Sequence, residues 1–532
     1  MYYPRHSGPL SCMASGNEQA IETAPSSHRR FTVNVAASLA SLVISVLVGL
    51  WYTPYMIRHL GVAVYGLLPL ANSITNYMTI LTIAVCATVA RYITMDLARN
   101  DVENANRHFN TFLVVGTAMA AALFAFAYVF SSFLPRFFKI PAGQEQAAKY
   151  VFLGVAGSFL ISTIANTFQS SIWVANRFEV RSLIEASLVL ARAGLIVLSF
   201  RIWAPALWQV SIIIPLVAIF GLVADVAACR ILVPSLRFRL SDYDRTKLPD
   251  LWSTSQWLLL SQLGNLLFVN IDLVVINIVM GPVASGRYAP LLQWVVLLRM
   301  LMGTITSSLS PPILVRYARG EMEALLRLSK QASKFLGLMI ALPAGLLTGF
   351  AKPMLGTWLG PAFPDLSGLT WLLLVPMAVE AAQNHFGNIV MATNKLRAPV
   401  LATLAFGVGN VVLAVLFTRY LGWGLYGVAA AGAITSLGRN GIFSPLYTAY
   451  MIDLHWSVFL KNMASSLAAA LALAAAAAVF SPLVRPGSWI RLGIGAAPLA
   501  VAYAGLMYFF ALNDEERLTL RKIALSSLRL PS

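Results

Sequence analysis

Long apolar stretches follow one another along nearly the whole chain. A helix needs about 20 apolar residues to cross the roughly 30 Å hydrocarbon core of a bilayer. Stretches of this length are Phe31–Ile57, Val64–Val89, Asn110–Phe133, Lys149–Val174, Leu183–Ile202, Leu207–Ile231, Trp252–Met280, Tyr288–Val315, Lys334–Leu355, Leu366–Ala392, Pro399–Phe417, Leu425–Tyr450, Met463–Phe480 and Trp489–Ala511. They are continuous and lack two-residue alternation, which favours helices over barrel strands. We predict an all-α polytopic membrane protein with about 14 transmembrane helices.

One stretch, Gln262–Tyr288, carries a single carboxylate, Asp272, near its middle. A bare carboxylate in hydrocarbon costs at least roughly 2.5–3.5 kcal/mol, so Asp272 should face protein or a water-filled cavity. Asn265, Gln262 and Ser261 precede it at helical spacing and are expected on the same face. The pattern predicts a membrane helix with one hydrated stripe. The alternative is a buried aspartate that only pairs structurally.

Basic residues are distributed unevenly between the connections. Of 38 Lys and Arg residues, 25 lie at the expected termini and even-numbered connections, and 10 lie at the odd-numbered ones. The positive-inside rule then predicts that both termini are cytoplasmic. Residues 1–30 and 512–532 are expected to be cytoplasmic tails, the first disordered, and 232–251 a cytoplasmic linker. The net charge of +17 is therefore mostly topological, so we expect no nucleic-acid partner.

Composition agrees with a membrane protein and excludes several enzyme classes. The chain is 58% hydrophobic and 11% charged, whereas soluble domains are about 25% charged. The cysteines Cys12, Cys86 and Cys229 show no paired spacing, which predicts neither a disulfide framework nor a metal site. The sequence contains no phosphate-binding GxxxxGK[ST] loop, no GxSxG and no HExxH. We therefore expect a protein without a cofactor, and a proton or sodium gradient is compatible with transport that lacks an ATP site.

Two parts of the chain, 31–231 and 252–450, are similar to each other. Asn166-Thr167-Phe168 matches Asn384-His385-Phe386, and Ala175-Asn176-Arg177 matches Thr393-Asn394-Lys395, both at an offset of 218 residues. Arg91-Tyr92 also resembles Arg316-Tyr317, at an offset of 225. The turn LGVAVYG at 60–66 corresponds to MGPVASGRY at 280–288. We predict two six-helix bundles in parallel pseudo-twofold repeat, which is a transporter architecture, with two C-terminal helices at 463–511.

These motifs resemble those of the polysaccharide-biosynthesis (Wzx-type) flippases. The resemblance rests on NIDLVVINIVMG with the following GRY, on the LGVAVYG turn and on the ANR and TNK junctions, and it extends over about 31–511. That family belongs to a superfamily with MATE exporters and lipid II flippases. It implies a flippase that moves an undecaprenyl-pyrophosphate-linked oligosaccharide, an O-antigen (lipopolysaccharide), exopolysaccharide or capsule unit, across the bacterial inner membrane. The implied partners are the lipid-linked oligosaccharide, membrane lipids, and the polymerase and glycosyltransferases of the same pathway.

Several ionisable residues lie inside expected spans and are our candidate site. Charged groups within membrane helices usually line a hydrated cavity or pair with one another. Guanidinium groups match phosphate oxygens, so the arginines are candidate substrate ligands. The carboxylates would balance charge or carry a coupling ion. The alternative is a set of structural ion pairs. The candidate arginines are Arg192, Arg299 and Arg439, and the candidate acidic residues are Asp225, Asp272 and Glu380.

Neutral polar residues extend this candidate site. Asn166 and Asn384 occupy matching positions in the two repeats and are candidates for sugar binding. His385 is a candidate proton carrier, although a lone histidine is more often a buried structural group. Polar residues also join membrane helices by packing, which is the alternative for all three.

Other function classes remain open. A membrane-embedded polysaccharide polymerase or ligase would have similar hydropathy, but such proteins typically carry a large outer loop, and the outward connections here are short. A MATE-type drug–cation antiporter should prefer acidic cavity groups, whereas three intramembrane arginines favour an anionic substrate. The sequence does not separate lipid II from an oligosaccharide unit.

Overall fold

The computed structural model describes residues 25–78, 92–97, 99–247, 259–260, 262–393, 395–511 and 517. Most of the expected tails and parts of the expected spans 64–89 and 252–280 lie outside these residues. Every regular element within the described residues is a helix, which confirms the all-α prediction.

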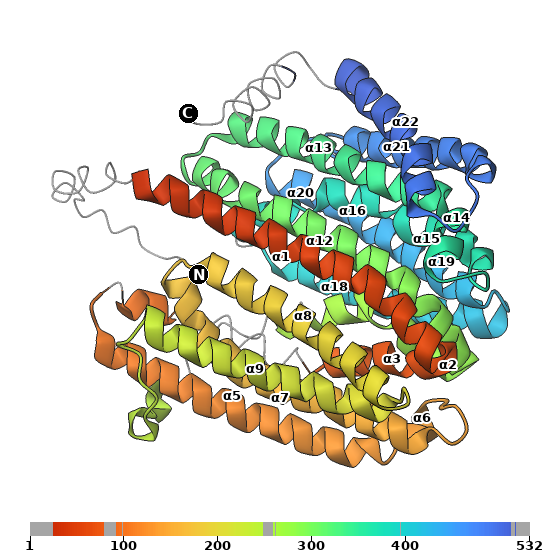
Figure 1. Cartoon of the computed structure of the whole chain (residues 1–532). Helices are drawn as coiled ribbons and strands as arrows, with labels where there is room; N and C mark the ends of the chain where they lie inside the picture. Colours follow the sequence, from red (N-terminus) through yellow and green to blue (C-terminus); the bar gives the residue numbers. More distant parts are fainter. Residues whose placement is uncertain are drawn as a thin grey trace, which may run out of the picture.

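The N-terminal half is a bundle of long helices with two short ones at its turns. α1 packs on α8, and α7 packs between α5 and α9 (Figure 1). A 3-10 pair, η2 (Leu240–Asp242) and η3 (Arg245–Lys247), follows α9 and covers the beginning of α5. The helices are α1 (Pro25–Leu60), α2 (Val62–Tyr65), α3 (Leu67–Asn76), α5 (Val102–Ser131), α6 (Leu134–Phe137), α7 (Glu145–Val174), α8 (Phe178–Ile202) and α9 (Leu207–Leu232).

The C-terminal half contains more interrupted helices. A helix over Gln262–Val269 leads into α11 (Asp272–Met280). The others are α12 (Pro282–Ala318), α13 (Met322–Gly349), α14 (Ala351–Trp358), η4 (Pro364–Leu366), α15 (Ser367–Leu374), α16 (Met377–Gln383), α17 (Phe386–Thr393), α18 (Arg397–Val415), η5 (Leu416–Tyr420), α19 (Leu425–Ser436), η6 (Leu437–Phe443) and α20 (Ser444–Met451). η5 and η6 are π-helical. The chain continues through α21 (Leu460–Phe480), η7 (Ser481–Leu483), α22 (Trp489–Leu506) and η8 (Met507–Ala511), and α21 packs along α13.

The described residues contain 11 helices that are long and apolar enough to cross a membrane, or 12 if one bent pair is a single span. A multi-span helical protein is therefore confirmed, but the predicted number of about 14 spans is not. The expected span 64–89 lies partly outside the described residues. The expected span 425–450 is divided by the π-helical segment η6, so it does not form one uninterrupted α-helix.

The outer surface of these helices is apolar. Leu47 is 62% exposed, Val223 is also 62% exposed, and Ile490 is 75% exposed. Such side chains would be unfavourable in water but suit contact with lipid. The chain is thus a multi-pass membrane protein.

Equivalent backbone turns confirm the internal repeat. Gly61 (φ 81°) ends α1, and Gly281 (φ 99°) ends α11, at an offset of 220 residues. Both glycines have a left-handed φ that favours glycine. The turns before α5 and α13 also match at 220: Asn100 (φ 58°) corresponds to Gly320 (φ 72°).

This register corrects one sequence match. The amide of Asp101 donates to the carbonyl of Asp96, and the amide of Glu321 donates to the carbonyl of Arg316, again at 220. In this register Arg316 corresponds to Asp96 and Tyr317 to Leu97, so the expected match of Tyr92 to Tyr317 at an offset of 225 is wrong; Arg91 lies outside the described residues. The error arose because an Arg-Tyr pair is too short to fix a register inside apolar helices.

Candidate functional site

The membrane helix that carries Asp272 is broken immediately before that residue. The helices Gln262–Val269 and α11 meet at an angle of 48°, with Asn270 and Ile271 between them. The expectation that Asn265 and Asp272 share one face of a single continuous helix is therefore wrong. Asn265 and Asp272 lie on different sides of the break rather than on one continuous helical face.

Asp272 is buried at the first position of α11, with 7% of its surface exposed. Its Oδ2 accepts a hydrogen bond of 3.2 Å from the Tyr288 hydroxyl. Among the described residues, its Oδ1 has no hydrogen-bond partner. Tyr288 belongs to α12 and is fully buried. One oxygen of Asp272 therefore has no partner at hydrogen-bond distance in the protein interior, although the Asn410 side chain also acts on this carboxylate; a proton or a cation would satisfy that oxygen.

Arg299 of α12 and Glu380 of α16 form a bidentate ion pair. The Nε of Arg299 lies 2.8 Å from Oε1 of Glu380, and its Nη2 lies 3.2 Å from Oε2. Both side chains are less than one-third exposed. The fork geometry fixes both groups, and the charge of Glu380 neutralises that of Arg299.

Arg439 projects from the π-helical segment η6. Its Nε donates to the Thr403 hydroxyl at 3.0 Å, and its Nη1 donates to Oδ1 of Asn440 at 2.9 Å. The guanidinium carbon lies 5.4 Å from the ring centre of Phe268. Within the described residues Arg439 forms no ion pair, so its charge is held by neutral groups and an aromatic face.

These groups surround a cavity of about 510 Å³ inside the C-terminal half, which we call the C-half cavity. A second hollow of about 50 Å³ adjoins it and contacts Asp272, Arg299 and Glu380. The C-half cavity is lined by charged, amide and aromatic side chains, among them Asn265, Phe268, Arg299, Glu380, Gln383, Asn384, Arg439, Phe443 and Tyr447. This size and mixture of groups are typical of small-molecule sites.

The two neighbours Asn384 and His385 have different surroundings. Asn384 lines the cavity and donates to the Thr306 hydroxyl at 3.0 Å. His385 is fully buried, and its ring centre lies 4.5 Å from that of Phe386. Because His385 is absent from the cavity lining, its placement suits the structural alternative better than a proton path.

The candidates of the N-terminal half lie elsewhere. Asp225 of α9 is buried, and its Oδ2 accepts a 3.1 Å hydrogen bond from Gln169 of α7, while its Oδ1, like that of Asp272, has no hydrogen-bond partner among the described residues. Asn166 is exposed on α7, and Arg192 is exposed on α8. No hydrogen bond or ion pair of Arg192 occurs among the described residues, although its charge acts on Tyr52 of α1. The structure thus brings together Asp272, Arg299, Glu380, Asn384 and Arg439, and leaves Asn166, Arg192 and Asp225 apart.

Sequence reasoning missed several lining residues. Phe443 and Tyr447 follow Arg439 at intervals of four, so helical spacing could have revealed them. Thr403 and Phe268, which contact Arg439, lie in segments distant in sequence, so no spacing pattern relates them to Arg439.

Solved membrane transporters have the same architecture. A multidrug resistance MATE family transporter of the MOP superfamily, in its inward-facing conformation, matches with a TM-score of 0.62 at 15% identity, over 79% of this chain and 98% of that chain. The lipid II flippase MurJ in its inward closed conformation also gives 0.62 at 15% identity, over 90% and 99%. The chain therefore has the fold shared by MATE transporters and MurJ.

A sequence relative defines the family. The chain is 30% identical to the uncharacterized membrane protein EpsK of Bacillus subtilis (strain 168) over 488 residues, which are 92% of this chain and 97% of that protein. The chain belongs to the same family as EpsK. No family model matches. The narrower assignment to the Wzx-type branch stays a prediction.

Proposed function

We propose that this protein is a flippase that translocates a lipid-linked oligosaccharide, carried on a polyprenyl pyrophosphate, across the bacterial inner membrane by alternating access. The N and C termini would face the cytoplasm. The headgroup would pass between the two halves while the lipid tail stays in the bilayer. The MATE/MurJ fold supports translocation in general, and the residues of the site support the choice of cargo.

The observation that carries the choice of cargo is the charge of the C-half cavity. Glu380 is already neutralised by Arg299, whereas Arg439 has only neutral partners. Among the described residues that line the C-half cavity, Arg439 is therefore the charged group without a direct ion pair, although Glu380 also acts on it through space. A partly buried guanidinium in this position favours an anionic ligand, such as a phosphate or an acidic sugar, over a cationic drug.

The neutral side chains that line the C-half cavity are suited to binding a sugar. Amides of Asn265, Gln383 and Asn384 offer donors and acceptors for hydroxyl groups. The rings of Phe443 and Tyr447 stack with an interplanar angle of 9° and provide apolar surface beside them. Arg192 on α8 would supply a second positive group from the N-terminal half, and Asn166 a further amide.

We propose that Asp272 takes up the coupling ion. Asp272 lines a small hollow beside Arg299 and Glu380, and its Oδ1 has no hydrogen-bond partner among the described residues. A proton or a sodium ion bound there would change the charge balance around the cavity and thus its affinity for an anion. Glycosyltransferases that build the cargo and a polymerase that uses it are the expected pathway partners.

The test is to delete the gene and follow lipid-linked sugars by mass spectrometry with leaflet-specific labelling. Accumulation of complete polyprenyl-pyrophosphate oligosaccharide on the cytoplasmic face, reversed by the intact gene, is the expected result. Units stranded on the outer face would instead indicate a polymerase or ligase. Accumulation of lipid II would indicate a lipid II flippase, and unchanged lipid-linked sugars with altered drug resistance would indicate a MATE-type antiporter.

A further inference from the structure

The two halves of the molecule meet at the end that carries the turns at Gly61 and Gly281. There α2 packs against α12, and α3 packs against α11; Figure 1 shows α2 and α3 side by side at this end of the molecule. Hydrogen bonds cross between the halves at this end. Thr53 donates to Gln293 at 2.8 Å, and the Trp358 indole donates to the Leu50 carbonyl at 2.5 Å.

A third link lies beside them. The backbone amide of Lys139 donates to Oδ1 of Asn277 at 3.0 Å, and Nδ2 of Asn277 donates back to the Lys139 carbonyl at 3.2 Å. The side chain of Lys139 also donates to the Val279 carbonyl at 2.7 Å. The connection after α6 is thereby fastened to α11 of the other half.

At the centre of this contact two equivalent glycines pack against each other's backbone. A Cβ on Gly66 would lie 2.8 Å from the Pro282 carbonyl oxygen and 2.8 Å from the Gly286 nitrogen. A Cβ on Gly286 would lie 2.0 Å from the Val62 carbonyl oxygen. Gly66 corresponds to Gly286, and Val62 to Pro282, at the offset of 220. The contact is therefore reciprocal, as at a twofold interface.

The backbone conformation at each of these two positions does not by itself require a glycine. Gly66 has φ −58°, and Gly286 lies inside the helix α12. Both conformations are common for any residue. What excludes a side chain is the backbone of the opposite half, which cannot move aside as a flexible side chain can. The two halves can approach this closely only while both positions are glycine.

We propose that the Gly66–Gly286 contact is the seal that closes this end of the translocation path. Opening would separate Val62 from Gly286 and Pro282 from Gly66 together, because the contact is reciprocal. A methyl group at either position would prevent closure and shift the population toward a state open at this end. The inference rests on the proposed alternating access for its functional meaning, but the contact itself is measurable without any substrate.

The experiment measures closure by cross-linking in the full-length protein. Thr53→Cys and Gln293→Cys, whose native side chains touch, are introduced after Cys12, Cys86 and Cys229 are replaced by serine. The rate of disulfide formation between the two cysteines in membranes is then compared with and without Gly66→Ala. Overpacking of this kind should slow the reaction about tenfold or more.

A matched glycine supplies the control. A Cβ on Gly194, in α8, would have no heavy atom within 4 Å. Gly194→Ala makes the same chemical change in a helix and should leave the cross-linking rate unchanged. Gly286→Ala should reproduce the effect of Gly66→Ala. Unchanged rates in both Gly66→Ala and Gly286→Ala would overturn the proposal.

A second measurement applies if these variants fail to accumulate in the membrane. The Thr53→Cys/Gln293→Cys disulfide, in the same background without native cysteines but with Gly66 and Gly286 unchanged, should block transport, and reduction should restore it. Persistent transport by the cross-linked protein would contradict the seal. If the glycine variants slow cross-linking while gene deletion leaves lipid-linked sugars unchanged, the seal stands and the proposed cargo is wrong.

Discussion

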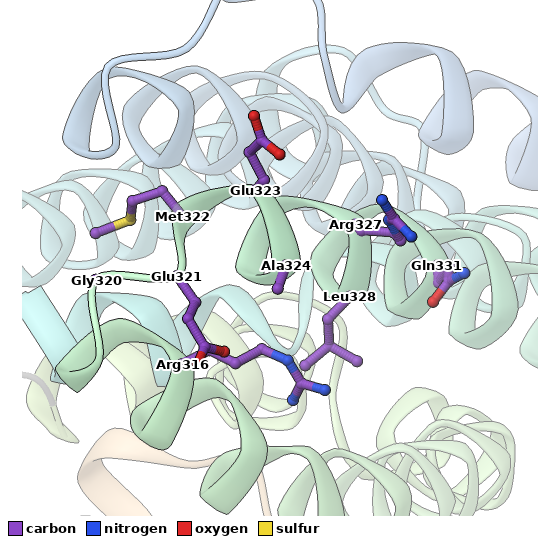
Figure 2. Close-up of a pocket in the computed structure, with 9 residues that line it drawn as sticks. All are labelled: Arg316, Gly320, Glu321, Met322, Glu323, Ala324, Arg327, Leu328 and Gln331. Atoms are coloured by element: carbon purple, nitrogen blue, oxygen red, sulfur yellow. The ribbon is translucent and has the colours of Figure 1, made fainter.

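The N-terminal and C-terminal halves repeat the same corner, at the start of α5 and at the start of α13, and each corner carries a surface pocket, of about 650 Å³ and about 610 Å³ respectively. Among the described residues, the pocket at α5 is also lined by the connection after α9. Glu103 and Arg107 of α5 correspond to Glu323 and Arg327 of α13, at the offset of 220. Arg107 lies 2.6 Å from Glu103 and 3.7 Å from Asp244, which belongs to the connection after α9. At the other corner, a surface pocket of about 610 Å³ is lined by Arg316, Arg327 and their neighbours from α12 and α13 (Figure 2).

The membrane interior shows a second contrast between the halves. In the described part of the N-terminal half, Asp225 is bound to Gln169 and Arg192 is exposed. In the C-terminal half, two arginines and two carboxylates converge on the C-half cavity and its adjoining hollow. Among the described residues, the two halves share turns at an offset of 220, while the intramembrane arginines and carboxylates of the candidate site converge only in the C-terminal half. The comparison can be tested by changing equivalent groups in the two halves.

The largest effect is expected at Arg439. Arg439→Gln removes the guanidinium that has no direct ion pair among the described residues that line the cavity, and charge-assisted hydrogen bonds contribute about 1.5–3 kcal/mol. Transport of lipid-linked sugar should fall by about 10- to 100-fold, measured as the rate of leaflet transfer in proteoliposomes. Arg419→Gln, an exposed arginine in η5, is the control and should transport normally. Equal rates for both variants would mean that Arg439 is structural.

The second test compares the two buried aspartates. Asp272→Asn should abolish the dependence of transport on an imposed proton or sodium gradient, because an amide cannot bind either cation as a carboxylate does. Asp225→Asn should keep the dependence, since an amide oxygen can still accept from Gln169. Transport of each variant is measured with and without each gradient. A gradient response that survives Asp272→Asn would exclude Asp272 as the coupling group.

The third test concerns stability. Glu380→Gln leaves Arg299 without its counter-ion, and breaking a buried ion pair costs about 3–5 kcal/mol. Because water in the cavity screens the pair, we expect about 2–3 kcal/mol and a lower melting temperature in detergent. Arg299→Gln combined with Glu380→Gln should recover part of that loss. Additive losses in the double variant would show that the two groups do not stabilise each other.

The smallest effect is expected outside the membrane, at the helix caps of the two corners. Asp101 accepts a 3.0 Å hydrogen bond from the Asn104 amide, which lowers the pKa of Asp101, whereas Glu321 caps α13 without a side-chain bond. The pKa of Asp101 is about 3.9 in the unfolded chain and lower in the folded protein. The hydrogen bond of the cap therefore stabilises the folded state fully at pH values above about 3.9, and this stabilisation is lost as the pH falls through the folded-state pKa.

The Asn104 amide resonance should therefore shift with pH, with a midpoint below the usual aspartate pKa. The Ala324 resonance, at the equivalent position of α13, should show no such midpoint. Asp101→Asn should remove the titration. A midpoint at or above the ordinary value would be incompatible with the cap.

Much of this molecule could be predicted because apolar length and loop charge are strong local signals. The helical fold follows from such signals. Charged residues inside apolar spans point to a polar cavity, and the set includes Arg299, Glu380 and Arg439 but also Arg192 and Asp225, which lie elsewhere.

The break before Asp272 could not be predicted, because Val269-Asn270-Ile271 contains neither proline nor glycine. Periodicity also does not tell which neighbour a polar face meets. Sequence reasoning therefore groups Asp225 with the residues of the cavity, although it lies on α9 and contacts Gln169 of α7.

The break in the helix before Asp272 also creates an electric field from the main chain. Each helix end carries a partial charge of roughly half an elementary charge, positive at the N-terminus and negative at the C-terminus. Asp272 occupies the positive end of α11. Arg439 lies over Phe268, in the last turn before the break and therefore near a negative end. The backbone thus favours an anion at the position of Asp272 and a cation at the position of Arg439, independently of the side chains. This contribution persists when the surrounding side chains are exchanged.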